Sequence, residues 1–164
     1  MVWEEKATTE EIETARMRIR VLTDAQLREV VDAERDPELK EAYAEMLDGA
    51  LANPERRLWH TLWVMTLKDE RETVVGNLDF KGLDASRVVE IGYATPPGYE
   101  GRGLMTEAVG AMIRWAVATG LVDAAEAETA PENAASQRAL EKNGFRFAGK
   151  FGEEGPRFQW DNPR

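Results

Sequence analysis

A glycine-rich loop is the segment of this sequence whose residue types most clearly permit ligand chemistry. Gly98, Gly101 and Gly103 stand between a strand-like run at residues 88–94 and a helical pattern that begins at Leu104. Glycine lets backbone N–H groups converge and lets a ligand approach without a Cβ in the way. N–H groups at the start of a helix also favour an anion, because the helix dipole is positive there. The spacing therefore indicates a cradle for a diphosphate, with an ordinary glycine turn that caps a helix as the alternative.

Two common phosphate-binding motifs are absent from this loop. No Gly-Lys-Ser or Gly-Lys-Thr follows the glycines, which argues against a nucleoside-triphosphatase loop. The dinucleotide fingerprint Gly-x-Gly-x-x-Gly also fails, because its last position is Thr106 in this chain. The loop therefore fits neither of these nucleotide-binding classes.

Metal and thiol chemistry have few candidates. The sequence contains no cysteine, which excludes disulfides, thiolate zinc sites and cysteine nucleophiles. His60 is the only histidine, so we expect no metal site. This side chain could titrate near neutral pH and contact a substrate. Its neighbours are aromatic, however, and a packed histidine is the alternative.

The composition limits the kinds of molecule that the protein is expected to bind. The 164 residues carry a formal net charge of −10 and are 43% hydrophobic, which suits a single domain with a packed core. The acidic balance argues against nucleic acid, since phosphate binding needs many Lys and Arg side chains. Apolar runs fall well short of the roughly 20 residues that cross a bilayer, and the first six residues have no apolar signal core. We therefore expect a cytoplasmic protein that binds no membrane.

Period-2 and period-3.6 patterns predict the elements that position the loop. We predict strands at residues 14–21, 58–67, 73–80, 88–94, 122–129 and 145–149. Helices are predicted to begin at the capping residues Thr23, Asp36 and Asn133, and to span residues 104–119 after the loop. The prediction is an α/β (α+β) fold in one domain, residues 1–164. Its central sheet is mixed and largely antiparallel, with six to seven strands and about four flanking helices.

Three segments together resemble the GNAT superfamily of N-acetyltransferases. They are residues 90–93 (EIGY), residues 101–108 (GRGLMTEA) and residues 132–145 (ENAASQRALEKNGF). The likeness covers roughly residues 12–160, and the branch it most resembles is the ribosomal-protein-alanine N-acetyltransferases. It implies a sheet that splays apart at the cofactor strand, acetyl-CoA as co-substrate, and transfer of an acetyl group to a primary amine.

The resemblance also implies where coenzyme A binds. The loop amides would hold the pyrophosphate, and the pantetheine arm would lie along the strand that ends in the loop. The residues concerned are Gly101, Arg102, Gly103, Leu104, Met105 and Thr106 in the loop, and Tyr93, Ala94 and Thr95 at the strand end. Glu100 and Met105 depart from the family pattern, since Gln or Arg and a small residue are usual there. We expect Arg102 to offset the charge of Glu100, and coenzyme binding to be weaker.

The second motif contributes Asn133, Ser136 and Lys142 to the cofactor site by the same resemblance. Asn133 also reads as a helix cap, and Lys142 as a solvated side chain that could reach the 3′-phosphate. Many relatives protonate the leaving thiolate with a tyrosine seven residues after the asparagine, but that position is Leu140. We therefore predict Ser136 as the catalytic acid, with Tyr93 as the other option.

Acetyl transfer needs a neutral amine, so a base must remove the ammonium proton. Glu90 is the predicted catalytic base because it lies on the cofactor strand. His60, Trp63 and Asp79 are the predicted substrate-binding residues, with core packing as the alternative for the tryptophan and a surface role as the alternative for the aspartate. The acceptor is a peptide amine or a small-molecule amine, and the chain a monomer or a homodimer. A coenzyme A-binding module without turnover is the rival function.

Overall fold

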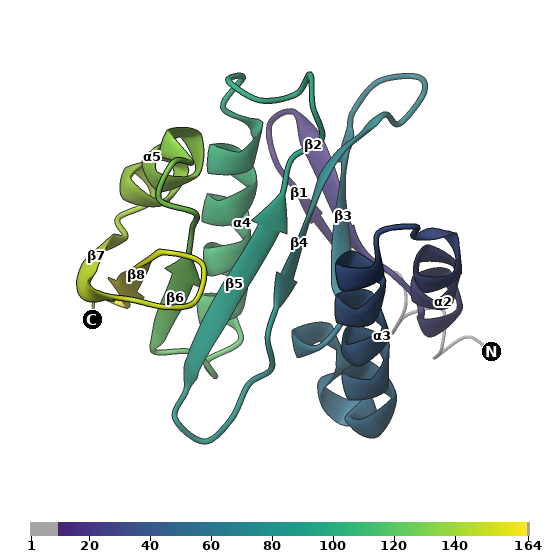
Figure 1. Ribbon diagram of the computed structural model, residues 1–164, viewed down its shortest axis with the longest axis horizontal. Helices are drawn as coiled ribbons and strands as arrows, with labels where there is room; N and C mark the ends of the chain where they lie inside the picture. The colour runs from purple at the N-terminus through teal and green to yellow at the C-terminus, as the bar shows by residue number, and fades with distance from the viewer. Residues whose placement is uncertain (1–9, 164) are drawn as a thin grey trace.

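The computed structural model describes residues 10–163, in which eight strands form one sheet in the order β1-β2-β3-β4-β5-β6-β8-β7 (Figure 1). The strands are β1 (Glu11–Glu13), β2 (Met17–Val21), β3 (Leu62–Leu67), β4 (Val74–Phe80), β5 (Val88–Ala94), β6 (Ala124–Glu128), β7 (Arg146–Phe151) and β8 (Pro156–Asp161). The helices are α2 (Asp24–Ala33), α3 (Pro37–Ala52), α4 (Leu104–Ala118) and α5 (Ala134–Lys142), with a 3₁₀ helix η1 (Pro54–Trp59). The predicted mixed α/β class is therefore confirmed. The first six residues, from which a missing signal core was read, lie outside the described residues.

The sheet opens between β5 and β6, its one parallel pair of neighbours among the described strands. Ladder pairing joins Val88–Glu90 to Ala124–Glu126 and stops there. Beyond that point Ile91–Ala94 pair only with β4, while Ala127 and Glu128 pair with β8. One edge of the last residues of β5 is thus left without a strand partner. This is the splay that the sequence predicted at the cofactor strand.

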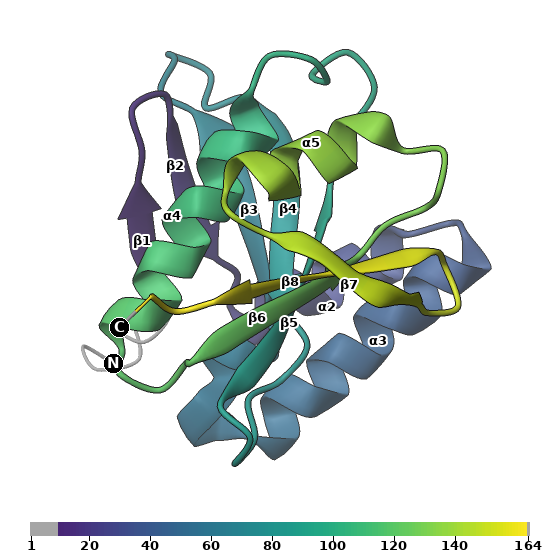
Figure 2. The same ribbon diagram turned by 90° about the vertical axis from the view of Figure 1, so that its left-hand side faces the viewer.

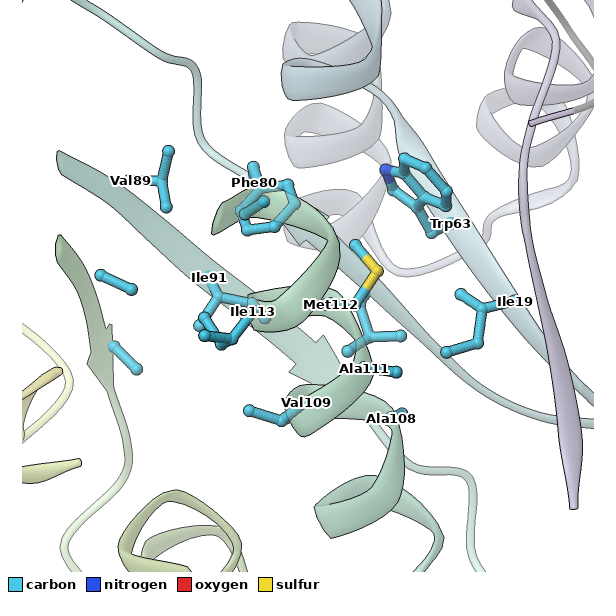
Figure 3. Packing of buried hydrophobic residues seen from close by; sticks show 14 of the residues in the cluster. Ile19, Trp63, Phe80, Val89, Ile91, Ala108, Val109, Ala111, Met112 and Ile113 are labelled. Atoms are coloured by element: carbon cyan, nitrogen blue, oxygen red, sulfur yellow. The ribbon is translucent and has the colours of Figure 1, made fainter. Parts of the chain in front are cut away.

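Helices cover both faces of the sheet. Figure 1 and Figure 2 show α4 on one face and α2 and α3 on the other, with α5 beside α4. The main core lies between α4 and the strands, and Figure 3 labels ten of its buried residues: Ile19, Trp63, Phe80, Val89, Ile91, Ala108, Val109, Ala111, Met112 and Ile113. A smaller cluster of Leu27, Leu47 and Leu62 lies under α2 and α3. Leu62 and Trp63 belong to different clusters because adjacent strand residues point to opposite faces.

Local capping chemistry sets where the helices begin, as predicted. The Thr23 hydroxyl accepts a hydrogen bond from Gln26 N at 3.0 Å, and the Gln26 side chain accepts one from Thr23 N at 2.9 Å. The Asp36 carboxylate accepts from Glu38 N, and the Asn133 side chain accepts from Ser136 N, each at 3.0 Å. These bonds satisfy N–H groups that a helix leaves unpaired at its start. The cap of α5 matters for function, because it fixes the turn that carries Ser136.

Three details of the predicted order were wrong. The sheet has eight strands because β1 pairs with β2 as a hairpin and β8 fills the place between β6 and β7. Residues 58–61 do not continue β3: η1 ends at Trp59, which is buried in the main core, and His60 follows it as the cap.

Within residues 10–163, no helix has the length and apolar character needed to cross a membrane.

Candidate active site

A cleft of about 480 Å³, here called the loop cleft, lies between the end of β5, the glycine loop and the first turns of α4 and α5. Eleven of the twelve predicted cofactor residues line it: Tyr93, Ala94, Thr95, Gly101, Gly103, Leu104, Met105, Thr106, Asn133, Ser136 and Lys142. Ser136 and Lys142 line it from α5. Two motifs that are distant in the sequence therefore meet at one cavity.

The backbone N–H groups of residues 101–106 are available to a ligand. Within residues 10–163, no hydrogen bond takes up any of these six amides, and the first amide of α4 with an internal partner is Glu107 N, which donates to Gly103 O at 3.1 Å. Gly103 caps α4 with φ of 75° and no side-chain cap. A Cβ added at Gly101 would meet no atom within 4 Å, so the loop surface there is open. Unpaired amides at a helix N-terminus match a doubly charged phosphate group.

Arg16 holds the loop from the side of the β1–β2 hairpin. Its Nη1 donates to Arg102 O at 2.9 Å, and its Nε donates to Glu107 Oε1 at 2.9 Å. The Glu107 carboxylate also accepts from Arg16 N at 3.0 Å and from the Thr14 hydroxyl. Burial acts to raise the pKa of this carboxylate, but the bonds from Thr14 and Arg16 lower it overall. The loop carbonyl at residue 102 is thereby held by Arg16, and among the described residues no amide of the first turn of α4 donates to it.

Arg102 is exposed and is not among the residues that line the loop cleft, so its contact with the phosphates stays a prediction. Its guanidinium lies over the Tyr99 ring, 5.3 Å from the ring centre. A cation is stabilised over the face of an aromatic ring, so this side chain has a partner away from the cavity. The backbone N–H of Arg102 has no hydrogen-bond partner among the described residues. Glu100 lies at the rim and is exposed, where water weakens its repulsion of a diphosphate.

Asn143 fixes α5 against the start of α4. Its side-chain amide donates to Thr106 O at 3.0 Å and to Ala139 O at 2.8 Å. A Cβ added at Gly110 would lie 2.6 Å from Asn143 Oδ1, so only glycine permits this approach without a shift. The two helices that carry the loop amides and Ser136 are therefore held in one arrangement.

Tyr93 joins the two motifs. Its hydroxyl lies 2.8 Å from Ser136 Oγ and donates to Ser136 O at 3.2 Å. Burial raises the pKa of the Tyr93 phenol, and the hydrogen bond to Ser136 opposes this only in part. The phenol therefore stays protonated at neutral pH. Leu140, at the position where a tyrosine was sought, is fully buried in the core and cannot reach the cleft.

A second cavity of about 520 Å³, here called the α3 cleft, lies between α3, β4, β5 and the turn before β8. It shares Tyr93 and Ala94 with the loop cleft. Its side chains include Tyr43, His60, Asp79, Lys81 and Glu90. The two clefts therefore meet at the end of β5, on the segment whose edge has no strand partner.

Asp79 is the carboxylate of the α3 cleft best suited to accept a proton near neutral pH. Burial raises its pKa from 3.8 to about 6, Lys81 lowers it in part, and Glu90 raises it further. An added Cβ at Gly92 would lie 3.0 Å from Asp79 Oδ1, so the glycine gives this carboxylate its place. A base works best when its pKa is close to the working pH.

Glu90 is held differently, and its surroundings argue against the predicted role as base. It accepts from Arg157 Nη2 at 2.8 Å and forms an ion pair with Lys81 Nζ at 3.1 Å. Although burial acts to raise its pKa, these two partners lower it below the ordinary range. A carboxylate so stabilised as an anion is a weak proton acceptor.

The two aromatic substrate candidates differ in position. Trp63 is fully buried in the main core, where its indole N–H donates to Leu58 O at 3.1 Å, and it lines neither cleft. Its prediction as a substrate contact is wrong because its strand face turns into the core. His60 does line the α3 cleft. Burial, with help from Arg56, lowers its pKa, so the imidazole is neutral there.

The chain matches the family of acetyltransferase (GNAT) domains over residues 7–146. The chain belongs to this GNAT family. An uncharacterized N-acetyltransferase of Bacillus subtilis (strain 168), YjdG, is 36% identical over 84 residues, which cover 51% of this chain and 49% of that protein. The matching segment thus spans about half of the curated relative.

Solved structures share the GNAT fold over most of their length. The ribosomal-protein-S5-alanine acetyltransferase of Vibrio fischeri superposes with a TM-score of 0.72 at 16% identity, and the match covers 93% of this chain and 97% of that one. A ribosomal L7/L12 alpha-N-protein acetyltransferase in complex with coenzyme A gives a TM-score of 0.71 at 14% identity, covering 93% and 98%. At these identities the likeness establishes the fold.

Four residues of this GNAT site were missed from the sequence: Arg16, Lys81, Asn143 and Arg157. Three of them act through partners far along the chain: Arg16 with Arg102, Asn143 with Thr106 and Arg157 with Glu90. Lys81 pairs with Glu90 on the neighbouring strand. A lone charged residue in the sequence gives no signal of such a partner. Among these four residues, only Asn143 gave a signal in its own neighbourhood, because it precedes Gly144 at the end of α5. The sequence analysis interpreted this pair only as the end of a helix.

Proposed function

We propose that this chain is an acetyl-CoA-dependent N-acetyltransferase that moves an acetyl group directly to a primary amine. One observation carries the proposal: the loop cleft and the α3 cleft meet at Tyr93 and Ala94, next to a run of six free backbone amides. An enzyme that joins two substrates needs two such cavities with a common point. Family membership supports the same reaction class.

The loop cleft is the proposed coenzyme A site. The amides of residues 101–106 would bind the pyrophosphate, and the unpaired edge of Ile91–Ala94 would hydrogen-bond the pantetheine arm. Arg138 and Lys142 line the same cleft from α5 and are exposed, which suits contact with the remaining phosphate. A bound acetyl-CoA supplies a thioester, whose acyl carbon an amine can attack.

The α3 cleft is the proposed amine site. Asp79 would accept the proton of the incoming ammonium, since its pKa of about 6 lets it act as a base at neutral pH. Lys81 and Glu90 lie beside it as an ion pair. His60 and Tyr43 line the same cleft and would contact the body of the acceptor. Transfer is direct because the sequence has no cysteine to carry the acetyl group.

The acceptor is either an amine at a peptide N-terminus or a small-molecule amine. One solved neighbour is named as an acetyltransferase of a ribosomal-protein alanine, and another as one that modifies the N-terminal serine of a ribosomal protein. These names make short alanine- and serine-terminated peptides the first acceptors to test. We also propose that residues 1–164 form one N-acetyltransferase domain. A cytoplasmic location and a monomeric or dimeric state stay predictions.

Release of free thiol from acetyl-CoA tests the function. Purified protein is incubated with acetyl-CoA and a panel of peptide amines, polyamines and other small amines, and the acetylated product is identified by mass spectrometry. We expect thiol release that depends on the acceptor. Tight binding of coenzyme A with no release for any amine would favour the rival function, a binding module without turnover.

A further inference from the structure

We infer that the Tyr93 hydroxyl is the group that protonates the departing coenzyme A sulfur, with Ser136 as the residue that positions and reprotonates it. The inference rests on the proposed function and chooses Tyr93, the second option from the sequence, as the acid in place of Ser136. It assigns both residues from their places in the two clefts.

The hydroxyl groups of Tyr93 and Ser136 differ in which clefts their residues line. Tyr93 lines both the loop cleft and the α3 cleft, whereas Ser136 lines the loop cleft alone. The acyl carbon must lie where both substrates reach it, so the bond that breaks lies at the shared wall. Tyr93 is the side chain of that wall with an acidic O–H, because the other shared residue is Ala94.

The hydrogen bond between the two residues has the form that a proton relay requires. The 2.8 Å contact joins Tyr93 Oη and Ser136 Oγ, and either oxygen can be the donor. Because the phenol has a single proton, Ser136 Oγ is the donor whenever that proton goes to Ser136 O, at 3.2 Å, or to sulfur. A serine hydroxyl rotates, so it can accept from the phenol in one state and donate to it in the next. The Asn133 cap holds Ser136 N at 3.0 Å and fixes the turn of α5 that presents this hydroxyl.

The step balances as follows. The amine nitrogen forms a bond to the acyl carbon, the carbon–sulfur bond breaks, and sulfur keeps the electron pair and takes the proton of Tyr93 Oη. The Tyr93 oxygen takes the Ser136 Oγ proton, and Ser136 takes one from water in the cleft. Before the attack Asp79 has taken one proton from the ammonium, and it releases that proton to solvent. After the carbon–nitrogen bond forms, the nitrogen loses a second proton, which neutralises the hydroxide left by the water that reprotonated Ser136. The net products are an amide, a thiol and one proton in solvent.

Steady-state kinetics of four variants test the roles. General acid catalysis contributes about 10²- to 10⁴-fold, so we expect Tyr93→Phe to lower kcat by about 100-fold or more. Ser136→Ala should lower kcat by about three- to tenfold, as for one lost hydrogen bond, and Ser136→Thr should restore most of that loss. The double variant should match Tyr93→Phe, because Ser136 acts through the phenol.

A second measurement needs no turnover. The ultraviolet absorbance of the thiolate reports the pKa of the thiol in bound coenzyme A. A phenol that donates to sulfur favours the thiolate, so this pKa should be lower in the wild type than in Tyr93→Phe. Thermal unfolding and the Kd for coenzyme A check that each variant folds and binds.

The outcomes are distinct. A larger kcat loss for Ser136→Ala than for Tyr93→Phe, or an equal thiol pKa in wild type and Tyr93→Phe, would overturn the inference and leave the proposed function standing. Wild-type protein that releases no thiol with any amine would overturn both.

Discussion

Replacement of Asp79 by asparagine should make the protein more stable at neutral pH while it removes activity. The pKa of Asp79 rises from 3.8 to about 6 on folding, chiefly because of burial. Below about pH 4 the group is protonated in the folded and unfolded chains alike and has no effect on their balance. As the pH rises from about 4 to about 6, the unfolded chain loses its proton first, so the stability of the folded protein falls.

The size of the effect follows from the same values. At about 1.4 kcal/mol for each pH unit between the two pKa values, the charged Asp79 lowers the free energy of unfolding by up to about 3 kcal/mol above pH 6. Asparagine has nearly the same shape and carries no charge. Asp79→Asn should therefore gain about 1–3 kcal/mol at pH 8 and nothing near pH 4.

Glu90→Gln is the matched control because the sign of its effect is opposite. The pKa of Glu90 is lowered on folding because its bonds to Arg157 and Lys81 outweigh the effect of burial. Its ionised form therefore stabilises the protein above its ordinary pKa, and this stability is lost as the pH falls through the folded value. Glu90→Gln should be less stable than the wild type at pH 8.

Urea unfolding of the three proteins at a series of pH values measures both effects. The thiol-release assay, run over the same series, should show wild-type kcat/KM rising with pH up to about 6 and then levelling. An Asp79→Asn variant that is no more stable than the wild type at pH 8, or that keeps wild-type activity, would refute the assignment of Asp79 as a buried base.

Three further predictions concern the loop cleft. Gly103→Asp should raise the Kd for coenzyme A at least about tenfold in calorimetry, because it adds a negative charge and a strained backbone beside the free amides; a wild-type Kd would place the diphosphate elsewhere. Gly110→Ala should lower the free energy of unfolding by about 1–3 kcal/mol in urea, because its Cβ would lie 2.6 Å from Asn143 Oδ1; a wild-type value would mean that this contact adapts freely. Arg16→Lys keeps the charge but loses the fork that joins Arg102 O to Glu107. We expect it to weaken coenzyme A binding by about three- to tenfold in calorimetry without lowering kcat at saturating acetyl-CoA, and an unchanged Kd would show that the loop needs no such anchor.

Local chemistry made much of the fold predictable. Thr23, Asp36 and Asn133 cap helices through bonds within three residues of each cap, so a short window of sequence contains the whole signal. The stripe of apolar residues from Leu104 predicted α4 to within one residue of its end. Residues 124–128 form β6 although alanine and glutamate favour strands poorly, because Ala124, Ala125 and Ala127 are buried in the sheet.

The fold prediction was wrong where contacts with residues distant in the sequence determine the local structure. The aromatic run that includes Trp59 and Trp63 alternates like one strand, yet Trp59 is in η1 and its ring packs 4.9 Å from that of Trp115 on α4. β8 begins at a proline and was missed, although its place between β6 and β7 completes the sheet.

The site was likewise predictable where local sequence determines it and unpredictable where distant residues do. The glycine spacing and the second motif predicted the lining of the loop cleft, because the ligand there would contact backbone groups that the motif itself positions. The electrostatics of the α3 cleft were not predictable, since Glu90 owes its low pKa to Arg157, which is 67 positions away. Asp79 was identified as a candidate but not as a base, because burial cannot be read from one strand.

The central claim is that the amides of residues 101–106 bind the diphosphate of coenzyme A while the end of β5 binds the arm. Backbone amide NMR of ¹⁵N-labelled protein, titrated separately with coenzyme A and with pantetheine, tests it most directly. Coenzyme A should shift the amide signals of residues 101–106 and those near Ala94, and pantetheine, which has no diphosphate, should shift only the latter. Coenzyme A that binds and leaves the signals of residues 101–106 unchanged would contradict the account.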